Sequence, residues 1–363
     1  MIELKKELIY EHLKREILDR ILFPGMRLPT EKELSRRLNV GQVTLRSALA
    51  RLEDEKLVVR IRGKGTFVCE SSFRKTFLLI LPDGTETLET PSRYIAEGLS
   101  TAAQKNQVTL ERCPETLLKN FSLSECREMI NRNHISGVIL ETGHRRPSPE
   151  LVRKIQQFKL PTVIPHGLPG DAENTGFLVL RTDEREAFSQ GLLTLKELGH
   201  RRIAFLRINI EGEDSDNIRG FSRQSLLDFY RKHDLDADGS LLTTAANRQE
   251  SISAAVKNWM RSSNPPTALI CHSDRIAMRA FSTLRELKIK VPEQLSLMGY
   301  SNYPGSQLML PALSTIDIHF QKCGEIAIEQ LCNAEKWYST DQTPDEIFTP
   351  FELILRESTP QLK

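Results

Sequence analysis

Three short stretches near the start of the chain decide its fold. They are LPTEKEL at 28–34, VGQVTLR at 40–46 and RIRGKGTF at 60–67. In this order they predict a helix, a turn, a second helix and a basic β-hairpin. Such an arrangement lays one helix in the major groove of DNA and places the hairpin beside it. We therefore expect the first 70 residues to form a helix-turn-helix with a wing that binds double-stranded DNA.

Local signals predict each element of this domain. An amphipathic first helix should run to about Leu22, because apolar residues recur at helical spacing. These residues are Leu4, Leu8, Ile9, Leu13, Ile17, Leu18 and Ile21. Thr30, followed three residues later by Glu33, forms a capping box that begins the next helix. A third helix is predicted over 41–55, with leucines on its inner face.

The third helix presents polar side chains suited to base recognition. Gln42 and Arg46 lie four residues apart and share an outward face. Glutamine bonds adenine and arginine bonds guanine, each through two hydrogen bonds that contribute about 1–3 kcal/mol of discrimination. Thr44 can reach a phosphate or a thymine methyl group, and Lys32 begins the helix that crosses the DNA backbone. Each residue alone also fits a solvated surface, but their order around one motif favours DNA binding.

A basic wing is predicted after the third helix. Short alternating strands at 57–60 and 66–69 enclose a turn of Arg62, Gly63, Lys64 and Gly65, where glycine allows a positive φ. The two basic side chains can enter a minor groove. Residues 1–70 hold 15 Lys and Arg against 11 Asp and Glu, whereas the rest of the chain holds 35 against 37. The basic excess thus lies where phosphate contacts need it.

The chain after residue 75 alternates strands with helices. It begins with FLLIL at 77–81, a continuous apolar strand of the kind buried in a parallel sheet. Further strands are predicted at 108–111, 137–140, 161–164, 202–207, 268–271 and 295–299. This alternation predicts a doubly wound α/β fold, and a stretch of this length exceeds one ordinary core. We expect two lobes, with ligands bound at the carboxyl ends of the strands.

Several functional classes are disfavoured by what the sequence lacks. The charged N-terminus shows no signal-peptide apolar region, and no apolar run approaches the roughly 18 residues of a membrane span. The six cysteines are scattered without a C-x-x-C pair, as in a reduced cytosolic protein. No P-loop, G-x-G-x-x-G motif, metal cluster or catalytic triad occurs. We expect a cytoplasmic protein that is not an enzyme, uses no cofactor or metal and binds no membrane.

Residues 1–70 resemble the winged-helix domain of the GntR family of bacterial transcription regulators. The resemblance rests on PTEKEL, VGQVTLRSALARL and RGKGTFV in fixed order. It implies DNA contacts by Lys32, Gln42, Thr44, Arg46, Arg62 and Gly63, beside the wing residue Lys64. Gly41 stands where the family has a polar residue that would add a contact.

Residues 76–358 resemble the effector domain of the LacI/GalR family, which is related to periplasmic sugar-binding proteins. The matching stretches are LGHRRIAFL at 198–206, PTALI at 266–270, SDRIAM at 273–278, LSLMGY at 295–300 and PALSTI at 311–316. The resemblance implies a two-lobed, periplasmic-binding-protein-like domain over 76–363. Lobe 1 is expected at about 76–181 with a returning helix at 317–336, and lobe 2 at about 182–314 and 345–358.

Three positions depart from the family's polar ligand-binding residues. His166 replaces an acid, Asn217 an arginine, and Ser301-Asn302 an Asp-Asp pair. Ser273 and Asp274 keep the pattern, although Asp274 also suits a helix cap. The resemblance thus implies an effector site of His166, Asn217, Ser273, Asp274, Ser301 and the ring of Phe320. Residues 91–94 could face the same cleft, and a neutral polar ligand is expected, a sugar or alternatively a nucleoside.

Together the two resemblances imply an effector-responsive transcription regulator. A repressor of a sugar catabolic operon is the first expectation, and an activator is the alternative. An enzyme would need catalytic residues that the motifs do not supply, and a transport protein would need a signal peptide. The expected partners are operator DNA, a small effector and a second copy, because paired winged helices match two half-sites about one helical turn apart.

Overall fold

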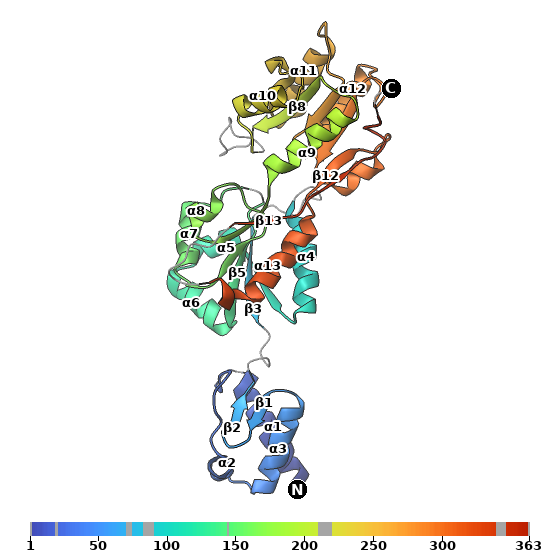
Figure 1. Cartoon of the computed structure of the whole chain (residues 1–363). Coiled ribbons are helices and arrows are strands. Elements are labelled where there is room, and N and C mark those ends of the chain that lie inside the picture. Colours follow the sequence, from blue (N-terminus) through green and yellow to red (C-terminus); the bar gives the residue numbers. More distant parts are fainter. Residues whose placement is uncertain are drawn as a thin grey trace. The chain divides into compact units, whose positions relative to one another are not determined.

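The chain folds as two compact units. The first comprises residues 1–75 and 107–109, and the second residues 76–106 and 110–363. The computed structural model describes residues 2–18, 21–69, 75–82, 91–143, 145–209, 220–338 and 346–361. Within these residues no helix is long and apolar enough to cross a membrane. Figure 1 labels the elements of both units.

The first unit is a three-helix domain with a two-stranded wing. Its elements are α1 (Ile2–Leu18), α2 (Glu31–Arg37), α3 (Gln42–Asp54), β1 (Val58–Ile61) and β2 (Gly65–Val68). The predicted capping box is confirmed: the Thr30 N–H donates to Glu33 Oε2 at 2.8 Å, and the Glu33 N–H donates to Thr30 Oγ1 at 3.3 Å. Strands β1 and β2 pair antiparallel, and Gly63 in their turn has φ +76°.

The first helix differs from its prediction in length and in its buried face. Helix α1 is described to Leu18, and Leu22 lies beyond it, still buried. Leu8 is 62% exposed, whereas Tyr10 is 1% exposed. The Tyr10 hydroxyl donates to Glu55 Oε1 at 2.5 Å, and the Arg51 guanidinium lies 3.8 Å from the ring centre. These polar contacts from α3 draw the tyrosine into the core, which apolar periodicity alone could not indicate.

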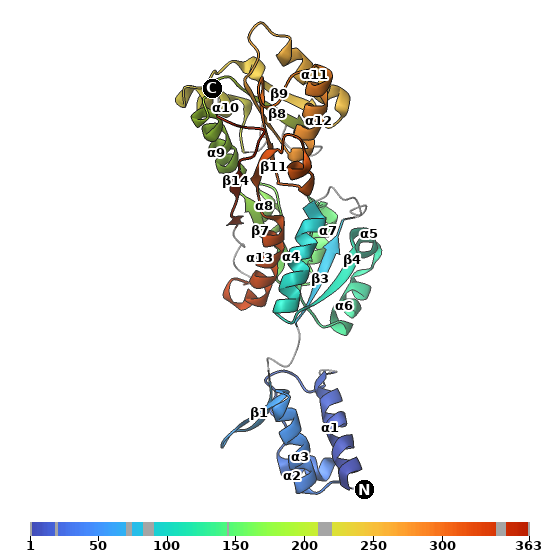
Figure 2. The ribbon, with the colours of Figure 1, turned by 90° about the vertical axis from the view of Figure 1, so that its right-hand side faces the viewer.

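The second unit contains two similar lobes, each built on a six-stranded sheet. In lobe 1 the strand order is β13-β7-β6-β5-β3-β4. Its strands are β3 (Thr76–Leu81), β4 (Thr109–Pro114), β5 (Ile135–Leu140), β6 (Thr162–Ile164), β7 (Leu178–Thr182) and β13 (Glu346–Thr349). Its helices are α4 (Pro91–Lys105), α5 (Glu115–Asn120), α6 (Leu123–Arg132), α7 (Pro149–Gln156), α8 (Asp171–Thr175) and α13 (Phe320–Cys332). Helices α4 and α13 cover one face (Figure 2), and α6, α7 and α8 cover the other, as Figure 1 shows.

Lobe 2 repeats this plan with the strand order β14-β12-β11-β10-β8-β9. Its strands are β8 (Ile203–Asn209), β9 (Leu242–Ala246), β10 (Ala268–Cys271), β11 (Ser296–Tyr300), β12 (Ser314–Asp317) and β14 (Glu352–Ile354). Its helices are α9 (Glu184–Glu197), α10 (Arg223–Lys232), α11 (Gln249–Met260) and α12 (Asp274–Glu286). Short 3-10 turns are η2 (Gly239–Leu241), η3 (Pro304–Leu308) and, in lobe 1, η4 (Ala334–Lys336). The doubly wound α/β prediction is thereby confirmed.

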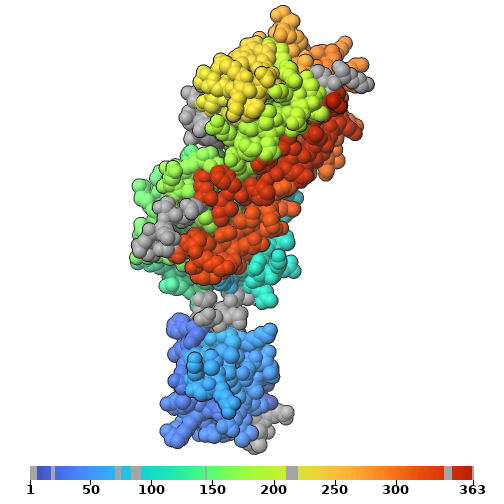
Figure 3. Space-filling model, viewed as in Figure 1, coloured from blue at the N-terminus to red at the C-terminus, as the bar shows by residue number. Residues whose placement is uncertain are grey.

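Three segments of chain cross between the lobes, and one corrects the predicted lobe boundary. They join β7 to α9, β12 to α13, and β13 to β14. Residues 345–358 were expected in lobe 2, but 346–349 form β13 and pair parallel with β7 of lobe 1. Arg181 reinforces this pairing through an ion pair with Glu346 at 2.7 Å. Figure 3 shows the C-terminal residues, in red, on the surface of both lobes.

Helices α4 and α13 meet through a pair of glycines. A Cβ added at Gly98 would lie 1.8 Å from the carbonyl oxygen of Gln321, and one at Gly324 would lie 2.3 Å from that of Ile95. Neither position therefore tolerates a side chain without displacement of backbone. This close approach fixes the ends of two helices whose first residues line the cavity described below.

Candidate nucleic-acid interface and ligand pocket

The predicted DNA-contacting residues lie on α2, on the first turns of α3 and at the wing. Lys32, Gln42 and Arg46 are exposed, as are Arg62, Gly63 and Lys64 in the turn between β1 and β2. Thr44 is half-buried beside them. The side chain of Arg46 is 60% exposed, and its Nε donates to Glu31 Oε2 at 2.6 Å. This ion pair joins α2 to α3 and holds the guanidinium at the surface.

The wing depends on a glycine beside its turn. Gly65 has φ +120°, and a Cβ there would lie 2.8 Å from the Nε of Arg27. Arg27 itself forms a backbone bridge with Phe67. Because Gly65 has no side chain, the Arg27 side chain can cross the hairpin at this point.

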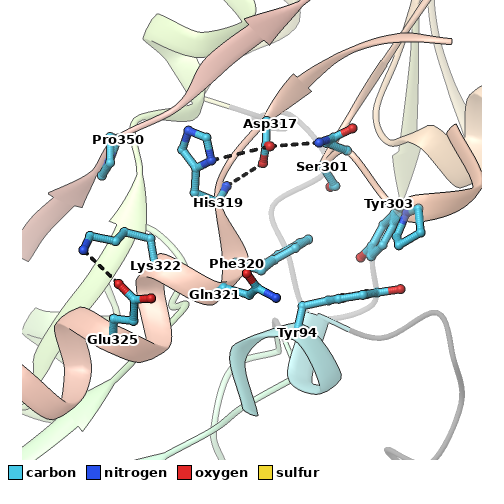
Figure 4. Close-up of a pocket in the computed structure, with 12 residues that line it drawn as sticks. Tyr94, Ser301, Tyr303, Asp317, His319, Phe320, Gln321, Lys322, Glu325 and Pro350 are labelled. Atoms are coloured by element: carbon cyan, nitrogen blue, oxygen red, sulfur yellow. Dashed lines mark hydrogen bonds and ion pairs between the residues drawn. The ribbon is translucent and has the colours of Figure 1, made fainter. Parts of the chain in front are cut away.

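A cavity of about 560 Å³ lies between the lobes, and three aromatic side chains line one side of it (Figure 4). The rings of Tyr94 on α4, Tyr303 after β11 and Phe320 at the start of α13 have centroids 5.6–6.1 Å apart. His166, 4% exposed, meets Phe320 edge-on at 5.4 Å. Two predicted residues, Ser301 and Phe320, line this cavity, whereas Tyr303 was missed and Tyr94 was expected only as part of 91–94.

A polar network ties the cavity to the segment that joins β12 to α13 and to the C-terminal segment after β14. Asn302 Nδ2 donates to Asp317 Oδ2 at 2.8 Å, and Arg356 Nη2 donates to Asn302 Oδ1 at 2.8 Å. The backbone N–H of His319 donates to Asp317 Oδ1 at 2.7 Å. Ser301 and Asn302 have φ values of +104° and +51°, in the positive range that residues with a side chain rarely adopt. The turn after β11 is therefore held in a strained shape by hydrogen bonds that reach β12 and the C-terminal segment.

Asp274 supports this turn and does not line the described cavities. Its side chain is fully buried, accepting from the Tyr303 N–H at 2.7 Å and from the Thr315 hydroxyl at 2.6 Å. Burial raises the pKa of Asp274 to about 7. A Cβ at Gly299 would lie 2.1 Å from its carboxyl oxygen, so the strand must have glycine there. Ser273 is half-buried at the N-cap of α12 and also lies outside these cavities, and Asn217 lies outside the described residues.

A second cavity, of about 360 Å³, opens at the carboxyl ends of β3 and β5 in lobe 1. It lies where the chain order of the strands reverses, which is the usual ligand position in such sheets. Glu141, 2% exposed, follows β5 there, and the Gly143 N–H donates to its Oε1 at 2.9 Å. Burial raises the pKa of Glu141, although hydrogen bonding and the charge of Arg145 oppose the shift. Sequence reasoning missed Glu141; its place directly after a buried strand could have revealed it.

Two family models match the chain in separate regions. Residues 5–68 match the bacterial regulatory proteins of the gntR family, and residues 192–359 match the periplasmic binding protein-like domain. The chain is also similar to the arabinose metabolism transcriptional repressors of Geobacillus stearothermophilus and Halalkalibacterium halodurans. Identity to the first is 26%, covering 97% of this chain and 98% of the relative. Identity to the second is 24%, covering 100% and 98%.

Solved structures share the fold of the second unit. A LacI-family regulatory protein from Chloroflexus aggregans is 20% identical with a TM-score of 0.61, covering 78% of this chain and 98% of its own. A LacI-family regulator from Enterococcus faecium with bound ribose is 20% identical with a TM-score of 0.57, covering 80% and 100%. The relatives are transcription regulators and not enzymes, as the sequence predicts. The chain thus joins a GntR-type helix-turn-helix domain to a periplasmic-binding-protein-like domain, and its relatives are transcription repressors.

Proposed function

We propose that the chain is a dimeric, effector-responsive transcription repressor of a sugar catabolic operon. The observation that supports this most is similarity along almost the whole chain to repressors of arabinose metabolism. The exposed basic residues of α2, α3 and the wing suit operator DNA. Effector binding between the lobes changes their arrangement and lowers operator affinity, because a ligand favours the state that binds it better.

The operator contacts are proposed to divide into base reading and backbone binding. Arg46, exposed at the second turn of α3, reads a base edge, and Lys32 on α2 binds a phosphate. Arg46→Ala should relax sequence preference at one operator position. Lys32→Ala should weaken binding to all sequences alike and lower the salt slope by about one unit. Selection from random DNA followed by salt titration measures both effects. If Arg46→Ala keeps the wild-type operator affinity and the wild-type sequence preference, Arg46 does not read a base.

The effector is proposed to be a neutral sugar that packs an apolar face on Tyr94 and Phe320 in the cavity between the lobes and reaches Glu141 of the lobe 1 cavity with its hydroxyl groups. A buried carboxyl offers acceptors for hydroxyl groups, and aromatic rings pack on the apolar faces of ligands. The aromatic cluster would equally stack a nucleoside base, which is the second candidate. His166, which meets Phe320 edge-on, and Ser301, which lines the cavity between the lobes, remain proposed contacts around these groups.

Glu141→Gln should weaken sugar binding by about tenfold, because one acceptor oxygen becomes an N–H donor. Thermal shift of the full chain with arabinose, ribose, adenosine and uridine measures this and separates the two ligand classes. Glu150→Gln, on the exposed side of α7, is the matched control and should behave as the wild type. Equal sugar affinity in both variants would exclude Glu141 from the site.

The dimer is proposed to form through the α/β lobes. Two large apolar side chains of lobe 2, Leu308 and Leu310, are 78% and 86% exposed. Burial of such residues between copies would bring two winged helices to one operator, as tight specificity requires. Sedimentation of the full chain should show a dimer that Leu310→Asp converts to a monomer. A wild-type monomer at micromolar concentration would contradict the proposal.

A further inference from the structure

Val43 is the most exposed large apolar side chain in the described part of the first unit. Its exposed fraction is 81%, compared with 62% for Leu8 and 61% for Phe23. A β-branched residue on an exposed helix position adds nothing to helix propensity, and its apolar surface is left in water. The fold of the unit therefore gives no reason for valine at this position.

The position of Val43 within α3 gives such a reason. It is the second residue of the helix, between Gln42 and Thr44, and it lies three residues before Arg46. Residues three apart are neighbours on one helix surface, so Val43 adjoins the side chain proposed to read a base. Thr44, by contrast, is half-buried. Gly41 before the helix adds no side chain, and no other atom lies within 4 Å of the position its Cβ would take.

The chemistry that fits an exposed apolar group among base-reading residues is the methyl group of thymine. This methyl is the only apolar group that an unmodified base presents in the major groove, and small apolar side chains contact it. We infer that Val43 contacts the 5-methyl group of a thymine beside the base pair that Arg46 reads. The inference rests on the proposed DNA-binding function and assigns a sequence preference within it.

The test removes the methyl group alone. The full-length protein is first used to select a preferred duplex from random DNA, and each thymine of that duplex is then replaced in turn by deoxyuridine. One replacement should weaken wild-type binding by about fourfold, the effect of one buried methyl group. Val43→Ser should bind the thymine duplex correspondingly less well and lose its sensitivity to that replacement. Leu8→Ser, on α1, removes a similarly exposed side chain and should keep the wild-type pattern.

The outcomes separate this inference from the function on which it rests. If the protein selects a duplex but every deoxyuridine replacement is tolerated, Val43 does not read a methyl group and DNA binding stands. If Val43→Ser keeps the wild-type sensitivity, another residue contacts the methyl and the inference is wrong. If no duplex is selected under low-salt conditions, the DNA-binding proposal fails together with the inference.

Discussion

A Gly98→Ala variant is expected to lose about 3 kcal/mol or more of the stability of lobe 1. The added Cβ would lie 1.8 Å from the Gln321 carbonyl oxygen and 2.9 Å from its Cα. Both atoms belong to the backbone of α13, so no side-chain rotation relieves the overlap. Overpacking of this kind typically costs about 1–3 kcal/mol, and the overlap with rigid backbone places Gly98 at the upper end.

Tryptophan fluorescence during urea unfolding measures the stability of the second unit without a signal from the first. The two tryptophans of the chain, Trp259 and Trp337, both lie in the second unit. Ser100→Ala, an exposed residue two positions further along α4, is the control and should change stability by less than about 0.5 kcal/mol. A wild-type unfolding midpoint in Gly98→Ala would show that α4 and α13 do not pack as described.

The stability of lobe 2 should fall as the pH rises from about 4 to about 7. An aspartate has an ordinary pKa of 3.8, which we take for the unfolded chain, whereas the pKa of Asp274 is about 7 in the folded protein. Between these limits the folded protein holds a proton that the unfolded chain has released, so a rising pH favours unfolding. The stabilising contribution is complete below the lower value and is lost as the pH passes the higher one. The full difference amounts to about 4 kcal/mol.

Asp274→Asn should flatten this pH dependence. The amide oxygen can still accept from the Tyr303 N–H, while the amide N–H₂ donates to the Thr315 hydroxyl, which acts as an acceptor. Urea midpoints at a series of pH values, followed by fluorescence, measure the slope. Asp228→Asn on the exposed face of α10 is the control and should keep the wild-type slope. Identical profiles for Asp274→Asn and the wild type would contradict a buried, protonated carboxyl group.

Local signals in the sequence were enough to predict the winged helix. The capping box at Thr30 and the wing glycine Gly63 each specify a backbone conformation within a few residues. The alternation of strands and helices likewise indicated the doubly wound fold. The burial of Tyr10 could not be predicted from local signals, because it depends on polar partners about 40 residues later in the chain.

The lobe boundary and the residues that line the cavities could not be predicted from the sequence. Residues 346–354 look like one extended segment, but Pro350 separates a strand of lobe 1 from a strand of lobe 2. Pairing partners decide this division, and they lie more than 150 residues away in sequence for β13. Asp274 matched a ligand-binding pattern, yet the missing Cβ of Gly299 lets its carboxyl turn into the core. Side-chain direction of this kind depends on tertiary contacts and not on spacing.

Effector binding and operator binding should be coupled in this protein. The most direct measurement is fluorescence anisotropy of a labelled operator, titrated with the full chain in the absence and presence of saturating sugar. An effective sugar should weaken operator binding by about 5- to 150-fold, and operator should weaken sugar binding by the same factor. Unchanged operator affinity in the presence of every sugar and nucleoside that binds the protein would contradict it.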